Sequence, residues 1–254
     1  MQLKSKNPFF KKSFAQEATV YHADGSQVID YNETMTVKGT VNKSFILFGL
    51  LLLGATIPVY LALAGKNPLV PGIISAVIGI ALVIACSVSP KNARYLAPAY
   101  ALFEGVFVGA VSIIFELRYP GVVVQGVLGT LITFGVCLAL YRFGIVKVTQ
   151  QFRSIVIAAT MAIASYYLVS MLFYWIGGVS FFHYGSSPLS IGFSVVVIIL
   201  AAMNLILDFD NIETGAAQRM PKYMEWYSGM GLIITLVWLY LEFLRLLSKL
   251  QSRN

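Results

Sequence analysis

The sequence has little charge for its length. Only 11% of its 254 residues are Asp, Glu, Lys or Arg, and 58% are hydrophobic, whereas a soluble domain averages about 25% charged residues. The mean hydropathy of +0.78 is typical of a polytopic membrane protein. Residues 1–43 are polar, with no apolar run after the early lysines. We therefore expect the first apolar segment to be a retained span, not a cleaved leader.

Cysteine and histidine are also scarce, which argues against several kinds of site. Cys86 and Cys137 each lie in an apolar run, where we expect small buried side chains and no disulfide scaffold. The two histidines, His22 and His183, are too few for a three-His zinc site. HExxH, GxGD, GxSG, the P-loop and GxGxxG are all missing from the sequence. We therefore expect no enzyme activity and no cofactor.

The apolar runs predict an all-α fold, a polytopic membrane protein built as a seven-transmembrane-helix bundle. A bilayer core about 30 Å thick needs about 20 apolar residues of helix, and backbone groups in lipid must be satisfied within the segment. The predicted spans are residues 45–64, 69–88, 95–115, 121–141, 154–177, 188–208 and 223–247. Short connections favour one compact membrane domain at residues 44–250, preceded by a polar tail at residues 1–43.

The net charge of +7 comes from cations in the tail and the connections, so we attribute it to membrane topology and not to nucleic-acid binding. One side of the membrane receives most of them: Lys4, Lys6, Lys11, Lys12, Lys38, Lys43, Lys91, Arg94, Arg142, Lys147, Arg153, Arg219 and Lys222. The other side receives Lys66, Arg118, Arg245, Lys249 and Arg253. This bias predicts a cytoplasmic N-terminus and, with an odd number of spans, a C-terminus outside.

Two carboxylates are found in the last two apolar runs, where an ionisable group is costly and indicates a functional site. Asp208 closes the sixth predicted span, and Glu242 lies inside the seventh. Arg245 follows Glu242 at i+3, so an intrahelical ion pair is an alternative interpretation of Glu242. Asp210, two residues after Asp208, is interpreted as a charge at the membrane interface.

The third predicted span contains another acid, Glu104, with no cation near it in sequence. Four polar residues of other spans are candidates to bond it: Gln125, Thr130, Thr160 and Asn204. The same span contains a GxxxG pattern, Gly105 to Gly109, which predicts close approach of a neighbouring helix.

Several of these segments resemble the Bax inhibitor-1 family, and its bacterial branch more closely. They are LDFDNI at residues 207–212, LYLEFLRLL at 239–247, APAYALFEG at 97–105 and KGTVNK at 38–43. The resemblance extends from about Val37 to Lys249 and depends on the order and spacing of short motifs. It implies seven helices with the last one central, in the bacterial inner membrane.

The resemblance also implies a function. Several members of the family are described as pH-sensitive calcium leak channels, in which an acid at the end of the sixth helix and one in the seventh sense pH. Asp208 and Glu242 match these positions, although the family usually carries Asp at the second. Arg94 matches a basic residue that has been linked to the acid pair. The segment between the acids looks long, with Arg219 to Lys222 inserted.

The leading hypothesis is therefore a proton-gated calcium pathway. Two carboxylates within hydrogen-bond reach would share one proton, and their oxygens would suit transient Ca²⁺ binding. The alternative is a non-conducting membrane scaffold that binds other membrane proteins, such as a stress or protease regulator. Proton-coupled transport of a solute is a third possibility.

Overall fold

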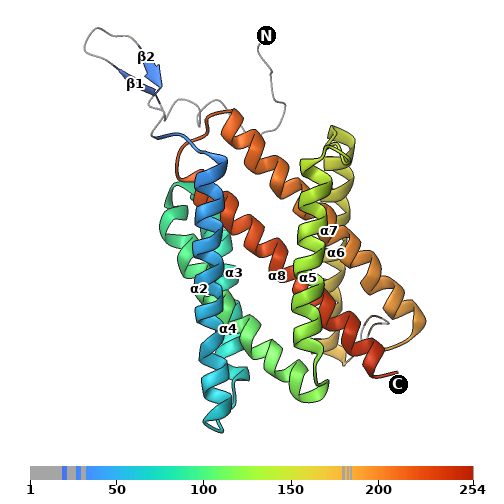
Figure 1. The fold of residues 1–254 in the computed structure, drawn as a ribbon. Coiled ribbons are helices and arrows are strands. Elements are labelled where there is room, and N and C mark those ends of the chain that lie inside the picture. Colours follow the sequence, from blue (N-terminus) through green and yellow to red (C-terminus); the bar gives the residue numbers. More distant parts are fainter. Residues whose placement is uncertain are drawn as a thin grey trace.

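Seven helices make up the membrane domain. The computed structural model describes residues 19–21, 27–29, 33–178, 181, 183 and 185–253. Within this part of the chain the helices form one bundle (Figure 1). They are α2 (Val37–Leu63), α3 (Leu69–Val88), α4 (Ala93–Arg118), α5 (Val122–Arg142), α6 (Gln150–Gly177), α7 (Pro188–Ala217) and α8 (Met224–Gln251). All seven are long and apolar enough to cross a membrane, which confirms the predicted fold class.

Short elements complete the described chain. A 3-10 turn, η3 (Pro90–Asn92), precedes α4. In the tail, β1 (Thr19–Tyr21) pairs with β2 (Gln27–Ile29) as an antiparallel hairpin. The remainder of the predicted tail up to residue 32, with Lys4, Lys6, Lys11, Lys12 and His22, lies outside the described residues.

Polar side chains mark where several helices begin. Thr36, Thr149 and Ser187 each accept a hydrogen bond from the amide three residues later and so cap α2, α6 and α7. Such caps satisfy amides that have no partner inside the helix. Gly178 ends α6 with a φ of 64°, a left-handed conformation that glycine adopts without strain.

Several helices extend beyond the predicted spans, and α2 and α7 extend furthest. These two differences affect the acids. Because Thr36 caps its first turn, α2 begins at Val37, before the apolar run at residue 45. The helix α7 continues past Asp208 to Ala217. Asp208 therefore lies inside its helix, which corrects the predicted position at the end of the span.

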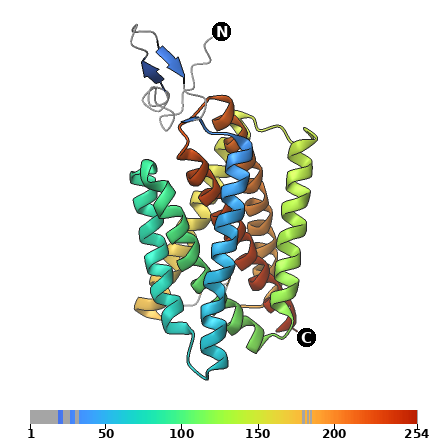
Figure 2. The ribbon, with the colours of Figure 1, turned by 60° about the vertical axis from the view of Figure 1, so that its left-hand side comes forward.

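The last helix, α8, is central, as predicted. It crosses the bundle obliquely and lies behind α2 and α5 in Figure 1, and Figure 2 shows it enclosed from a second side. It packs against α2, α4, α5 and α7. Ile233, Leu239 and Leu244 of α8 are almost completely buried in the core. The other helices turn large apolar side chains outward, for example Leu63 and Trp175, each 84% exposed, which suits a lipid-facing surface.

The GxxxG pattern of α4 packs against α2, which confirms the predicted close approach. A Cβ atom added to Gly105 would lie 2.1 Å from the carbonyl oxygen of Leu51, and one added to Gly109 would lie 2.7 Å from that of Ala55. In return, a Cβ atom on Gly54 of α2 would lie 2.2 Å from the carbonyl oxygen of Leu102. The two backbones therefore touch where only glycine leaves room.

Candidate functional site

The contact between α7 and α8 carries polar groups at both of its ends. At one end, the Thr235 hydroxyl of α8 donates to the Gly231 carbonyl oxygen at 3.2 Å and lies beside the Asp208 carboxyl group of α7. At the other end, Lys249 Nζ donates to Ser194 Oγ at 2.7 Å and to the Ser190 carbonyl oxygen at 3.3 Å. The two helices are antiparallel, so these contacts define their register along the whole interface.

Asp208 has an unsatisfied oxygen inside this interface. Its Oδ2 atom is buried, and among the described residues it has no hydrogen-bond partner. Its Oδ1 atom lies 4.0 Å from where a Cβ on Gly231 would be, so the backbone of α8 approaches the carboxyl group closely. Leaving such an atom unpaired costs about 1–3 kcal/mol. Because native proteins seldom retain such groups, Asp208 is a candidate for binding a proton or a cation.

Glu242 is also buried but is fully engaged. It has no exposed surface, and Arg245 Nη1 donates to its Oε1 at 2.8 Å, which confirms the ion pair predicted from the i+3 spacing. The hydroxyl of Tyr167 on α6 lies 3.1 and 3.3 Å from the two carboxylate oxygens. The Arg245 guanidinium lies 4.8 Å from the Tyr167 ring centroid. The sequence pattern did not reveal Tyr167, because only the fold brings α6 to this point.

The structure does not bring Asp208 and Glu242 together. Thr235, the partner of Asp208, and Glu242 are seven residues apart on α8, which is about 10 Å of helix. Each carboxyl group has its own partners, so the predicted shared-proton pair is not formed in this conformation. The described part of the chain also contains no cluster of three His, Cys, Asp or Glu side chains that could hold a metal ion.

Apolar side chains separate the two acids. The antiparallel register set by the two polar contacts brings Ala201 and Leu205 of α7 and Leu239 of α8 to the stretch of the interface between the acids. All three are completely buried and belong to one core cluster. We call these three residues the apolar seal. A buried apolar layer of this kind excludes water. It therefore separates the polar group at Asp208 from the polar groups at Glu242 and Lys249 on the same interface.

Glu104 lies elsewhere in the bundle. It hydrogen-bonds Tyr100, one turn earlier on α4, and its Oε2 lies 3.1 Å from the Cβ position of Gly79 on α3. Asn204 and Thr160, two of its predicted partners, instead bond each other at 2.8 Å.

The remaining predicted residues are not joined to the acid sites. Asp210 accepts a hydrogen bond from Arg153 Nη2 at 2.5 Å, and so connects α7 to the start of α6. Arg94 is exposed and stacks on the ring of Tyr95, 4.6 Å from the ring centroid. The described contacts bring neither Asp210 nor Arg94 to Glu242.

A buried acid that the sequence pattern did not single out, Glu225, ties α8 to the start of α2. Its side chain has no exposed surface and pairs with Lys43. Its Oε1 accepts hydrogen bonds from both the amide and the hydroxyl of Thr36 at 3.0 Å. A Cβ on Gly39 would lie 2.0 Å from the same oxygen. We call Thr36, Lys43 and Glu225 the N-terminal latch.

The segment that looks inserted between the acids supports the latch. The Met35 amide donates to the Met220 carbonyl at 2.6 Å, and the Lys222 amide donates to the Glu33 carbonyl at 2.8 Å. These bonds hold the chain before α2 against the connection from α7 to α8. The extra residues therefore have a structural role at this end of the bundle.

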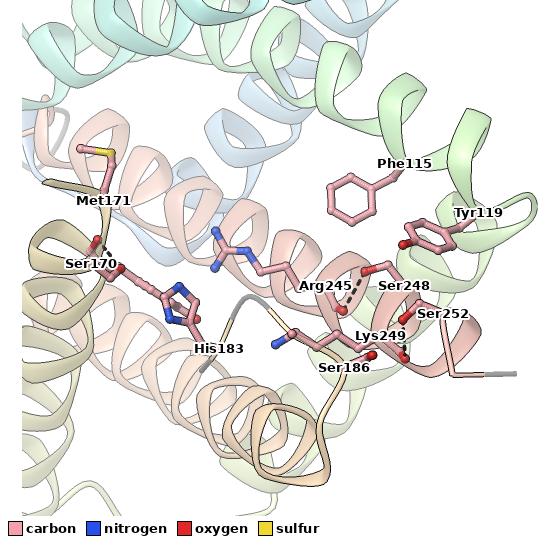
Figure 3. A pocket seen from close by; sticks show the side chains of 12 residues that line it. Phe115, Tyr119, Ser170, Met171, His183, Ser186, Arg245, Ser248, Lys249 and Ser252 are labelled. Atoms are coloured by element: carbon pink, nitrogen blue, oxygen red, sulfur yellow. Dashed lines mark hydrogen bonds between the residues drawn. The ribbon is translucent and has the colours of Figure 1, made fainter. Parts of the chain in front are cut away.

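A cavity of about 610 Å³ opens at the opposite end, around the last turns of α8. Figure 3 shows Arg245 and Lys249 reaching from α8 into it, and His183 on the far wall. Burial, followed by the charges of Arg245 and Lys249, lowers the pKa of the His183 ring to about 4. Tyr166 also hydrogen-bonds this ring at Nδ1, at 2.9 Å.

Comparison with known proteins agrees with the motifs and the fold. Searches among curated proteins and among solved structures found no match. The sequence matches the family described as Bax inhibitor 1 like over residues 7–252, which is nearly the whole chain. With its seven membrane-spanning helices, the chain belongs to the Bax inhibitor 1 like family of integral membrane proteins.

Proposed function

We propose that this protein is a proton-regulated calcium leak channel whose pathway follows the interface of α7 and α8. The observation that carries the proposal is the buried, unpaired Oδ2 of Asp208. A carboxylate oxygen is a good ligand for Ca²⁺, a hard cation. It is also a site that a proton can occupy instead, so protons and cations compete there.

The proposed closed state depends on the apolar seal. With Ala201, Leu205 and Leu239 completely buried, a hydrated ion cannot pass from Asp208 toward Glu242. Charged Asp208 attracts a cation and water into the interface, whereas protonated Asp208 does not. Calcium flux should therefore rise with pH.

Glu242 has a separate role in this proposal. Its ion pair with Arg245 and its contact with Tyr167 hold α8 against α6 beyond the seal. Because Asp208 and Glu242 have no common partner, we expect them to act independently, and not as one titrating pair.

Reconstitution of the purified protein in calcium-loaded liposomes tests the proposal. We expect Asp208→Asn to give low flux at every pH, because its amide cannot ionise. Leu239→Ala should raise flux at every pH, because it thins the seal. Glu213→Gln is the matched control: it removes an exposed carboxylate of the same helix that bonds Tyr141, and its pH profile should equal that of the wild type.

The double variant Asp208→Asn/Glu242→Gln distinguishes independent acids from a shared proton. Independent sites predict that the changes in the logarithm of the flux add, and a shared proton predicts that they do not. Unchanged flux in Asp208→Asn at all pH values would refute the proposal. A wild type that conducts at no pH would instead favour the scaffold alternative.

A further inference from the structure

The cavity at the end of α8 has a positive lining that a calcium leak does not require. Among the described residues that line it, Arg245 and Lys249 are cationic and none is acidic. The sequence of the connection between α6 and α7, residues 178–187, also contains no Asp or Glu. Glu242 lies behind Arg245 and pairs with it, so one positive charge is left without a matching carboxylate in the cavity.

Another described carboxylate near this end of the bundle, that of Glu116, is already bonded. Glu116 accepts hydrogen bonds from the amides of Gly121 and Val123, at 2.7 and 3.1 Å, and so caps the start of α5. It does not line the cavity. An anion that enters the cavity therefore meets two cations and no lining acid.

The lining also supplies hydrogen-bond donors. Lys249 is only 9% exposed, and its ammonium group is held in place by Ser190 and Ser194. Arg245 is held by Glu242, so both cations are ordered before a ligand arrives. Tyr119 and Ser186 present further hydroxyl groups to the cavity. The other lining hydroxyls already donate to Glu242 or to backbone carbonyl oxygens, and they belong to Tyr167, Ser170, Ser248 and Ser252. Guanidinium, ammonium and hydroxyl groups together are the donors that phosphate oxygens accept best.

We propose that this cavity binds a phosphate group between Arg245 and Lys249, carried either by a lipid headgroup or by a soluble phosphate compound. The volume of about 610 Å³ is in the range of small-molecule sites. Apolar contact is available beside the cations from Phe115 and Met171 (Figure 3).

The experiment uses the full-length protein and two probes. Equilibrium dialysis of detergent-purified protein against labelled inorganic phosphate measures the soluble source. Native mass spectrometry after incubation with mixed phosphatidylcholine and phosphatidylglycerol vesicles measures the lipid source. We expect saturable binding of at least one probe, and about tenfold weaker binding in Lys249→Gln, because one charged hydrogen bond is lost.

A second variant keeps the test valid if Lys249→Gln fails to fold. Ser252 is exposed at the rim, so Ser252→Trp should fill the cavity and weaken binding while both cations remain. The matched control is Lys66→Gln, in the connection between α2 and α3 at the same end of the bundle. Lys66 is exposed and does not line the cavity, so its loss should leave binding unchanged.

The outcomes separate clearly. Binding of inorganic phosphate that Ser252→Trp weakens supports a soluble ligand, and retention of phosphatidylglycerol over phosphatidylcholine that Ser252→Trp abolishes supports a lipid headgroup. If the protein binds neither inorganic phosphate nor phosphatidylglycerol, the proposal is overturned. It is also overturned if Lys66→Gln weakens binding as much as Lys249→Gln does. Neither binding measurement depends on calcium flux. The phosphate site can therefore fail its test while the leak function stands, and the leak function can fail while the phosphate site stands.

Discussion

Each buried carboxylate of this bundle has a different environment, and the environment sets its role. Glu242 has a cation on its own helix, and Glu225 has one on a neighbouring helix. Asp208 has only a threonine hydroxyl. A paired carboxylate contributes mainly to structure, because its charge is already compensated. Of these three acids, Asp208 has no cation beside it, so we propose that its charge is the one that changes with function.

The N-terminal latch gives the first prediction at the scale of single residues. Removing one partner of a buried ion pair leaves the other charge uncompensated and typically costs 3–5 kcal/mol. Lys43 keeps 19% of its side chain exposed, so we expect Glu225→Ala to lower the free energy of unfolding by about 3 kcal/mol. Thermal or denaturant unfolding of the detergent-purified protein measures it.

Glu213→Ala is the control for this change. Glu213 is an exposed carboxylate that bonds Tyr141, so its loss should cost at most about 1 kcal/mol. Equal destabilisation by both substitutions would show that the latch does not stabilise the fold.

His183 gives a prediction about pH. Burial lowers the pKa of its ring to about 4 from an ordinary 6.5, so the folded protein favours the neutral ring. The stabilisation is complete above about pH 6.5 and is lost as the pH falls toward 4, by up to about 3 kcal/mol. We expect His183→Gln, which does not titrate, to lose less stability than the wild type between these pH values.

Melting temperatures measured across this pH range test the prediction, and the chain offers a matched control in its other histidine. His22→Gln removes the same chemical group from the tail and should leave the wild-type pH profile in place. Parallel curves for wild type and His183→Gln would contradict the assigned pKa shift.

At the scale of the elements, close contact of α2 and α4 depends on glycine. A Cβ on Gly105 would lie 2.1 Å from the Leu51 carbonyl oxygen, so Gly105→Ala must push the helices apart. We expect a loss of about 2–3 kcal/mol in the free energy of unfolding, the upper part of the range for overpacked cores. Gly135 of α5 is the control: nothing lies within 4 Å of its Cβ position, so Gly135→Ala should leave stability unchanged or slightly raised.

The register of α7 and α8 explains why Asp208 and Glu242 do not meet, although both match acid positions of the family. The Asp208–Thr235 contact fixes one end of the interface, and the Ser194–Lys249 contact fixes the other. Glu242 lies midway between Thr235 and Lys249 on α8, so it faces the apolar middle of α7. Sliding the helices by two turns to join the acids would break both polar contacts.

At the scale of the whole molecule, the seven spans found among the described residues predict that the start of α2 and the end of α8 lie on opposite sides of the membrane. The distribution of Lys and Arg predicts that the connection from α5 to α6 is cytoplasmic and that the end of α8 is outside. Cys86 and Cys137 are buried, so their replacement by Ala gives a background for labelling with an impermeant maleimide.

In intact cells we expect Ser252→Cys to be labelled, and Lys147→Cys to be labelled only after the membrane is opened. Both positions are exposed in the structure. The reverse pattern would show an inverted orientation, and labelling of both in intact cells would contradict the seven-span topology.

Sequence alone determined the fold class, the presence of seven apolar spans and the close contact that α4 makes through its glycines. These features depend on local quantities: the length of an apolar run, the cost of an exposed backbone group in lipid, and the size of a side chain. The same reasoning identified Asp208 and Glu242 as costly residues, and Arg245 as a partner of Glu242, because that pair lies within one helical turn.

Only the tertiary structure decided which groups meet across helices. It moved Asp208 from a helix end into the interior of α7, placed the apolar seal between it and Glu242, and paired Glu225 with Lys43 from the other end of the chain. It also gathered Arg245, Lys249 and His183 around one cavity. The register of packed helices depends on all their contacts at once, so spacing within one helix predicts its own pairs and not those between helices.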